Sequence, residues 1–417
     1  MHIVFATVEF ITEKAGDGGL ANYLAKASQI FADRGHRITI VVLSDQDGNI
    51  SYYPNVEVVR VRMDEAIVSL VLHSIHHRDI KQIIEMCLHS YKLNQKIRRI
   101  HQKDKIDVVQ YCHLDALGLF RNRKIPSIVR MSAFDPIDRE THKADFTLSG
   151  CQAVVNVSDK LNFSAIRRAD GLFAPSKITA RVLQKTINRE CEVLETPTMK
   201  IDKNKLRDLP DNLQGKKYFL FFGTLNNKKG LRVIIQSIRR ILKENPLYYF
   251  VMIGKDCGVS FYDGMRTPVV GRMKKEAGEY GERIVYFPAM FDRELLNSII
   301  YHADFCILPY RFDNLPNTCV EAMQLGKIVI STYKSGISQL IKNGYNGFLV
   351  EQNNPEALID KVREVIELPD NEKRSISSNA VKRTERMNPD NFCNYMMRYY
   401  RRVIDEHGEG NKRGKRK

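Results

Sequence analysis

The feature that most constrains the fold of this chain is a regular alternation between short apolar runs and longer amphipathic stretches. The short runs are rich in Val, Ile and Phe, as buried strands are, and the stretches between them have helical apolar spacing. In the first half we predict strands at 3–7, 38–43, 56–61, 108–110, 127–130, 172–174 and 191–194. Strands that alternate with helices form parallel sheets covered by helices on both faces, which predicts an α/β fold.

A polar stretch at 201–217, containing Pro210 and Gly215, interrupts this alternation and is typical of a linker. Strand patterns then resume at 218–222, 248–253, 284–287, 305–308 and 328–330. We therefore expect two Rossmann-like domains facing each other across a cleft, with ligands at the carboxyl ends of the strands. The predicted parts are a first domain at 1–205, a second at 206–385, a helix at 386–406 that returns to the first domain, and a disordered basic tail at 407–417.

Composition narrows the class of protein. A chain of 417 residues is long enough for two hydrophobic cores, and its formal net charge of +16 favours an anionic partner or a solvated basic surface. The eight cysteines are scattered and form no C-x-x-C pair, which is typical of reduced thiols and not of disulfides or zinc sites. The N-terminus has the pattern of a strand and not of a signal peptide, and no apolar run is long enough to span a bilayer. We expect a cytoplasmic protein.

Two glycine-rich loops follow predicted strands. The first contains Lys14, Gly16, Gly18 and Gly19, whose amides could face a phosphate or an acceptor at a helix N-terminus. Its spacing differs from the dinucleotide-binding G-x-G-x-x-G pattern, and a plain tight turn is the alternative.

The second glycine-rich loop begins at Gly223 and ends with Lys228 and Lys229 before a predicted helix. A glycine that admits a diphosphate and a lysine that neutralises it make a reasonable clamp. The alternative is that these lysines are ordinary surface residues at a helix start.

The strongest candidate site is the segment 310–323, where a predicted strand is followed by a polar loop and a helix that begins near 316–318. Asp313 lies in the loop and Glu321 lies about one turn inside the helix, so that the two carboxylates could bracket one ligand. Free amides at the helix start favour an anion. Acidic residues near a helix start also offset the helix dipole, but that explanation leaves the Asn-Leu-Pro-Asn loop unexplained.

With these motifs the chain resembles glycosyltransferase family 4, whose members are retaining enzymes with the GT-B fold. Asp313 and Glu321 stand at the two ends of that family's Glu–x7–Glu signature, and the glycines of 335–337 and 343–350 follow in the family's order. The loop 223–230 matches its phosphate-binding loop. The resemblance covers nearly the whole chain, is specific from 218 to 350 and is loose from 50 to 215.

The resemblance implies a role for each of these residues. It gives catalytic roles to Asp313, Glu321 and His113, with Glu321 at the donor ribose and the other two at the donor sugar. The strand end at 286–289 would border the base. The donor contacts that it implies are Gly223, Lys228, Lys229, Asn314, Leu315, Asn317, Thr318 and Glu321. The loop of Lys14, Gly16, Gly18 and Gly19 matches the family's N-terminal loop.

Three positions depart from the family pattern. Thr224 stands where an arginine is frequent, Asp313 is one methylene shorter than the usual glutamate, and Ser338 or Gln339 stands where an acidic residue is common. These departures bear on the identity of the donor rather than on the reaction class.

The predicted function is a retaining transfer of a hexosyl group from a UDP- or GDP-linked sugar to a glycan or lipid-linked acceptor, in surface polysaccharide or glycolipid biosynthesis. A glucosyltransferase similar to glycogen or starch synthase is the alternative within the enzyme class. A basic nucleic-acid-binding protein would explain the charge but not the carboxylates and glycine loops. We expect no cofactor and no metal, and we interpret the D-x-D of Asp45 and Asp47 as a surface turn.

The segment 73–105 carries eight Lys or Arg and three Asp or Glu, with apolar residues at helical spacing. It could contact an anionic membrane from the cytoplasmic side. It could equally be an amphipathic helix that packs on its own sheet with a solvated basic face.

Overall fold

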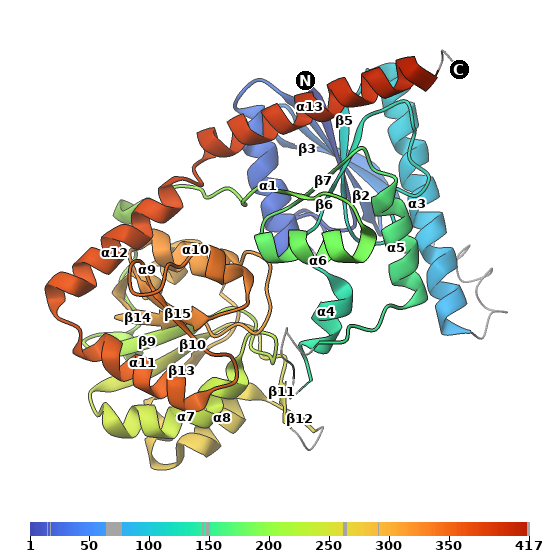
Figure 1. Ribbon diagram of the computed structural model, residues 1–417. Helices are drawn as coiled ribbons and strands as arrows, with labels where there is room; N and C mark the ends of the chain where they lie inside the picture. The colour runs from blue at the N-terminus through green and yellow to red at the C-terminus, as the bar shows by residue number, and fades with distance from the viewer. Residues whose placement is uncertain are drawn as a thin grey trace. The chain divides into compact units, whose positions relative to one another are not determined.

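The computed structural model in Figure 1 describes residues 1–14, 16, 18–63, 77–143, 146, 151–261, 265–290 and 292–414, with side chains through 410. The chain divides into two compact units. Unit 1 consists of the described residues of Met1–Pro136, Val154–Pro197 and Pro389–Lys417, and unit 2 of those of Ile137–Ala153 and Thr198–Asn388.

Unit 1 is built on one eight-stranded sheet with the order β3-β4-β2-β1-β5-β6-β7-β8. Every neighbouring pair is parallel except β3 and β4, which form an antiparallel edge. The strands are β1 (His2–Thr7), β2 (Arg37–Ser44), β3 (Gly48–Tyr53), β4 (Val56–Arg62), β5 (Val108–Cys112), β6 (Ser127–Arg130), β7 (Gly171–Ala174) and β8 (Glu192–Val193). The helices are α1 (Gly19–Ala32), α3 (Arg78–Lys103), α5 (Val157–Arg167), α6 (Lys177–Ile187) and α13 (Pro389–Gly414), and α4 (Asp135–Glu140) contains the change to unit 2.

Unit 2 has a six-stranded, fully parallel sheet with the order β13-β10-β9-β14-β15-β16, and a small antiparallel pair, β11 and β12. Its strands are β9 (Lys217–Phe222), β10 (Tyr248–Ile253), β11 (Val259–Ser260), β12 (Arg266–Thr267), β13 (Ile284–Phe287), β14 (Phe305–Ile307), β15 (Ile328–Thr332) and β16 (Phe348–Val350). Its further helices are α7 (Leu231–Glu244), α8 (Val269–Ala277), α9 (Arg293–His302), α10 (Asn317–Gln324), α11 (Pro355–Glu367) and α12 (Asp370–Glu385).

The central strands of unit 2 show why the sequence folds in this way. Residues 218–222 of β9 are almost fully buried, as expected for a strand covered on both faces, and they are apolar without alternation. Phe219 stacks between Phe250 of β10 and Phe305 of β14, with ring centroids 5.0 and 5.5 Å away. The two parallel sheets with their helices confirm the predicted α/β fold of two Rossmann-like units.

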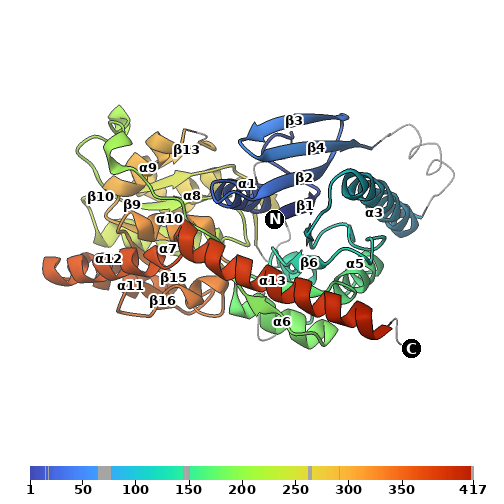
Figure 2. The ribbon, with the colours of Figure 1, turned by 90° about the horizontal axis from the view of Figure 1, so that it is seen from above.

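The C-terminal helix α13 groups with unit 1 (Figures 1 and 2). Phe392 packs on Phe31 of α1 with ring centroids 5.7 Å apart, and the Tyr400 hydroxyl donates to Gln110 of β5 at 2.6 Å. The helix continues to Gly414, through most of the segment 407–417 that was predicted to be disordered. One cause is His407, whose Nδ1 lies 3.0 Å from the Asp170 carboxylate and ties this part of the helix to the sheet.

The boundaries of the units differ from the consecutive domains 1–205 and 206–385 of the prediction. The described residues of 137–153 group with unit 2, although two predicted strands lie between them and the predicted linker. Among the described residues, no helix combines the length and the apolar character needed to cross a membrane.

Candidate functional site

The loop between β9 and α7 depends on glycines at both ends. Gly223 has φ +127° and Gly230 has φ +76°, values at which other residues are strained. A Cβ at Gly230 would lie 1.9 Å from the carbonyl oxygen of Pro309, directly after β14. The loop is therefore held against the end of the neighbouring strand, and this contact brings two predicted motifs together.

Lys229 and Asp313 meet at this point. The ammonium of Lys229 donates a hydrogen bond to the Asp313 carboxylate and lies 4.1 Å from the centroid of the Tyr310 ring. Lys228 forms an ion pair of 2.7 Å with Asp138. Both lysines of the predicted diphosphate clamp thus have carboxylate partners in unit 2.

The charge state of Asp313 follows from these neighbours. Burial raises the pKa of its carboxyl group, but the charges of Lys229 and Lys228, with hydrogen bonds from Lys229 and from the Asn314 amide, outweigh burial. The resulting pKa lies below the usual value of 3.8, so Asp313 is an ionised acceptor. An ionised carboxylate can accept hydrogen bonds from sugar hydroxyls.

The backbone around Asp313 is fixed by Gly336. The Gly336 amide donates to the Asp313 carbonyl oxygen at 2.9 Å, and a Cβ at Gly336 would lie 1.2 Å from the carbonyl oxygen of Asn314. Asn314 and Leu315 are both buried. The glycine in the Ser-Gly-Ile motif therefore lets the loop rest directly on a second backbone segment.

Helix α10 begins immediately after this loop. Its N-cap is Pro316, which makes no side-chain cap hydrogen bond, so the first amides of the helix are not covered by a cap. Asn317 and Thr318 are the first two helical residues, and the Thr318 hydroxyl lies 2.7 Å from that of Tyr310. An uncapped helix start beside Lys229 and Asp313 is suited to a phosphate group.

Glu321 is buried in α10, with 9% of its surface exposed. Its Oε1 lies 2.7 Å from the guanidinium of Arg293, the first residue of α9. The sequence did not point to Arg293, because an exposed arginine at a helix start is a common pattern and its contact with Glu321 depends on the packing of two helices.

The structure also shows a buried arginine that the sequence did not single out. Arg311 is 2% exposed and donates to the carbonyl oxygens of Thr141 at 2.8 Å, Lys143 at 2.5 Å and Phe146 at 2.9 Å. Asn227, in the loop after β9, donates to the carbonyl oxygen of His142 at 2.8 Å. These bonds attach Thr141, His142, Lys143 and Phe146 to the rest of unit 2, next to both site loops.

The predicted base-binding edge is the end of β13. The Tyr286 hydroxyl donates to the carbonyl oxygen of Gly254 at 3.0 Å. Gly254 itself packs on the site loop, since a Cβ there would lie 2.0 Å from the carbonyl oxygen of Gly223. The edge and the loop after β9 are therefore neighbours.

The predicted loop of unit 1 uses its polar groups internally. Lys14 forms an exposed ion pair of 2.5 Å with Asp45, which belongs to the D-x-D. The carboxylate of Glu9 accepts a hydrogen bond of 3.1 Å from the Ala21 amide in the first turn of α1, and a Cβ at Gly18 would lie 2.7 Å from it. A carboxylate thus occupies the helix start where the sequence suggested a phosphate.

The remaining glycines of this loop differ from each other. A Cβ at Gly16 would lie 2.1 Å from the carbonyl oxygen of Phe10, whereas nothing lies within 4 Å of a Cβ at Gly19. Close backbone packing explains Gly16 and Gly18, while Gly19 leaves open space at the start of α1.

His113, directly after β5, is buried with 5% of its surface exposed. Its Nδ1 accepts a hydrogen bond of 3.3 Å from the Ser132 amide, so the neutral ring carries its proton on Nε2. Nε2 makes no hydrogen bond with a described residue and lies 3.7 Å from the Asp135 carboxylate. The ring therefore has a donor available.

Comparisons with known proteins bear on unit 2 and on the fold. Residues 202–383, most of unit 2, match the family model of glycosyl transferases group 1. A sucrose-phosphate synthase from Thermosynechococcus elongatus superposes with a TM-score of 0.72 over 97% of this chain and 100% of that chain, at 15% identity. The superposition shows that this chain has the GT-B fold.

Two further relatives of this GT-B protein are informative. An Anabaena protein, HepE, has been solved in complex with UDP and superposes with a TM-score of 0.65 over 96% of this chain and 99% of that chain, at 14% identity. An uncharacterized glycosyltransferase of Methanocaldococcus jannaschii is 25% identical over 210 residues, which are 48% of this chain and 50% of that relative. The GT-B chain thus spans about half the length of that curated relative.

Proposed function

We propose that this chain is a retaining glycosyltransferase of family 4 that moves a hexosyl group from a nucleotide sugar to a glycan or lipid-linked acceptor. The observation that carries the proposal is the convergence of Lys229, Asp313 and the uncapped start of α10 within the part of unit 2 that matches the glycosyl transferases group 1 model. A cation, an ionised acceptor and free amides are the groups that a sugar diphosphate requires.

In this proposal the donor diphosphate binds Lys229, Asn317 and Thr318. It replaces Asp313 as the partner of Lys229, which frees the Asp313 carboxylate to accept hydrogen bonds from the donor sugar. Glu321 holds the ribose, and Arg293 orients the Glu321 carboxylate. The chain's residues then stabilise negative charge on the leaving diphosphate and position the two substrates, which are large contributions to catalysis.

His113 donates through Nε2 to the donor sugar in the same proposal. The free donor and the bonded Nδ1 support this role, because a neutral imidazole held in one tautomer can hydrogen-bond a hydroxyl group. The acceptor faces the loop of Lys14, Gly16, Gly18 and Gly19, where Gly19 leaves room.

A thermal-shift screen of UDP-, GDP- and ADP-linked sugars tests the proposal. We expect one nucleotide series to raise the unfolding temperature of the wild type and to lose this effect in Lys229→Met. The UDP in the Anabaena structure favours the UDP series, and a response to ADP-glucose alone would favour the synthase-like alternative. Absence of stabilisation across the whole set would contradict the proposal.

We also propose that the protein works at the cytoplasmic face of a membrane through α3. The described part of the segment 73–105 begins at His77, and residues 73–76 lie outside the described residues. Helix α3 packs on unit 1 through Met86, Leu93 and Ile97, whereas Ile80 and Tyr91 are 47% and 49% exposed. Flotation with anionic vesicles should weaken in Ile80→Ser/Tyr91→Ser, and equal flotation of both proteins would exclude α3 as the contact.

A further inference from the structure

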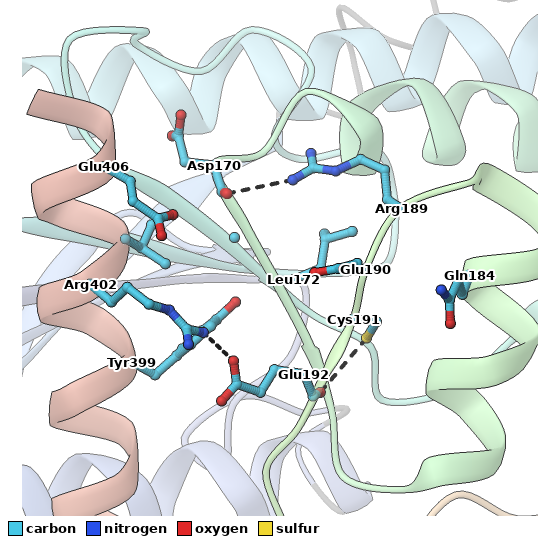
Figure 3. A pocket seen from close by; sticks show the side chains of 12 residues that line it. Asp170, Leu172, Gln184, Arg189, Glu190, Cys191, Glu192, Tyr399, Arg402 and Glu406 are labelled. Atoms are coloured by element: carbon cyan, nitrogen blue, oxygen red, sulfur yellow. Dashed lines mark hydrogen bonds and ion pairs between the residues drawn. The ribbon is translucent and has the colours of Figure 1, made fainter. Parts of the chain in front are cut away.

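Helix α13 borders two cavities of similar size in unit 1. The first has a volume of about 560 Å³ and is shown in Figure 3. Its arginines have partners inside the cavity wall: Arg402 forms an ion pair with Glu192, and Arg189 donates to the carbonyl oxygen of Asp170 at 3.5 Å. The lining residues of this cavity carry four carboxylates, Asp170, Glu190, Glu192 and Glu406, against two guanidinium groups, so it does not favour an anion.

The second cavity, of about 510 Å³, has a different charge. It lies between the end of α1 and the first half of α13, and we call it the α1–α13 cavity. Its lining residues are Arg34, His36, Cys393, Asn394, Met397, Arg398 and Arg401. Three guanidinium groups and an imidazole line it, and none of the lining residues carries a carboxylate.

The guanidinium groups come from two elements that are distant in sequence. Arg398 and Arg401 are three residues apart on α13, a spacing that places both on one face of the helix. Arg34 follows the end of α1 and donates to the carbonyl oxygen of Ile30 at 2.9 Å, which offsets the negative end of that helix. The fold therefore gathers positive charge that the sequence alone does not bring together.

These positive charges are only partly neutralised. Arg34 forms an ion pair with Asp390, whose side chain is 82% exposed. The Nε of Arg398 donates to the carbonyl oxygen of Asn394 at 3.3 Å, and Arg401 makes no hydrogen bond or ion pair with any described residue. An ion pair with so exposed a carboxylate contributes little, so an incoming anion can take the place of Asp390 at low cost.

His36 reports the same electrostatic environment. Burial lowers the pKa of His36, and the charges of the N-terminal ammonium, Arg401 and Arg34 lower it further. The ammonium nitrogen of Met1 lies 3.3 Å from Nδ1 of the ring. The imidazole is therefore neutral near pH 7 and can act as a hydrogen-bond partner without adding charge.

We propose that the α1–α13 cavity binds a phosphate group, carried either by a small soluble ester or by a lipid headgroup. Guanidinium groups match phosphate oxygens with paired hydrogen bonds, and the volume lies in the range of small-molecule sites. The site is in unit 1 and is separate from the donor residues of unit 2. It is therefore a second anion site that the proposed transfer reaction does not require.

The test compares wild type with Arg398→Gln/Arg401→Gln and with a charge-matched control, Arg181→Gln/Lys185→Gln. The control residues are exposed on α6 and do not line the cavity. Inorganic phosphate is titrated at constant ionic strength with UDP present throughout, and the unfolding temperature is recorded. We expect the wild type and the control to share one midpoint, and the cavity variant to need about tenfold more phosphate or to show no response.

A second arm uses co-sedimentation with phosphatidylcholine vesicles, with and without phosphatidic acid. Binding of free phosphate identifies a soluble ligand. Binding to phosphatidic acid vesicles without binding of free phosphate identifies a lipid headgroup. In either case the binding must depend on Arg398 and Arg401. Equal behaviour of wild type and cavity variant in both arms, or no binding by the wild type in either, overturns the proposal. The shift caused by UDP alone tests the donor site separately, and Arg398→Gln/Arg401→Gln should retain it.

Discussion

The ammonium group of Lys229 donates a hydrogen bond to the carboxylate of Asp313, a residue 84 positions further along the chain. The contact exists because the loop after β9 packs on the end of β14 through Gly230 and Pro309. Two residues that the sequence assigned to different parts of one donor are therefore partners of each other before a donor binds. In the proposed function, donor binding exchanges this ion pair for a bond between Lys229 and the diphosphate.

Lys229→Met should reduce kcat/KM for the nucleotide sugar by roughly tenfold to a hundredfold, because one charge-assisted hydrogen bond to the diphosphate is lost. Steady-state kinetics with the donor found in the thermal-shift screen would measure this. Lys243→Met, at the exposed end of α7, should retain wild-type rates. The double variant Lys229→Met/Asp313→Asn removes the unpaired carboxylate, and recovery of turnover in it would mean that Lys229 serves only to hold Asp313.

Glu321→Gln should raise the donor KM by roughly tenfold, because a neutral amide is a weaker acceptor for ribose hydroxyls than a carboxylate. A comparison of uridine and uracil binding by calorimetry would localise the loss to the ribose. Arg293→Gln removes the partner of Glu321 without removing the acceptor, so its effect should be smaller and in the same direction. A larger loss in Arg293→Gln than in Glu321→Gln would refute the assignment.

Gly336→Ala should destabilise unit 2 by about 2 kcal/mol or more and abolish donor binding, since the new methyl group would collide with the backbone of Asn314. Denaturant unfolding measures the first effect and thermal shift with the donor the second. Gly271→Ala is the matched control: it lies in α8, and nothing lies within 4 Å of a Cβ there. That substitution should be neutral or slightly stabilising, because alanine favours helix.

The stabilising effect of ionised Asp313 should depend on pH in a defined direction. The pKa of Asp313 in the folded protein is lowered from the ordinary value of 3.8. Between the folded-state pKa and 3.8, the unfolded state binds more protons than the folded state, so the free energy of unfolding rises with pH. The free energy of unfolding of the wild type should therefore exceed that of Asp313→Asn above pH 4. The difference should shrink as the pH falls below 3.8 toward the folded-state value.

Asp45→Asn is the control for this pH effect. Asp45 also has a lowered pKa, through its hydrogen bond from Lys14, but both partners are exposed. Its contribution should be small and should disappear at high salt, whereas that of Asp313 should persist. An unchanged difference between wild type and Asp313→Asn across this pH range would contradict the ionisation of Asp313.

Turnover should be insensitive to EDTA, because Lys229 and the start of α10 can neutralise the leaving diphosphate without a metal. Among the described residues there is no group of three His, Cys, Asp or Glu that could hold a metal ion. Loss of activity in EDTA that Mg²⁺ or Mn²⁺ restores would show that a metal binds together with the donor.

Much of the fold could be predicted from local sequence patterns. Runs such as 218–222 and 248–253 are continuously apolar because both faces of the strand are buried, and they became β9 and β10. The edge strand β3, Gly48–Tyr53, was missed because only one neighbour pairs with it and its residues are mostly polar or exposed. Helix α12 was also missed, since few of its residues are apolar.

The residues of the candidate site also fall into those that the sequence could predict and those that it could not. Asp313, Glu321, Lys229 and the glycine motifs could be found from the sequence because each lies at a fixed spacing from a strand end or a helix start. Arg293 could not be found, because its contact with Glu321 arises only where α9 packs beside α10. The sequence likewise did not show that the Glu9 carboxylate accepts a hydrogen bond at the start of α1, where an anion was expected to bind.

The sequence by itself therefore determined the alternation of strands and helices, the two parallel sheets and the chemical groups at the ends of β9 and β14. Only the tertiary structure decided that 137–146 belongs with unit 2, and that Arg34, Arg398 and Arg401 share one cavity. The physical reason is the separation along the sequence over which each kind of interaction acts. Apolar periodicity and turn chemistry act between near neighbours, whereas the bond from Arg311 to the carbonyl oxygen of Thr141 joins residues 170 positions apart.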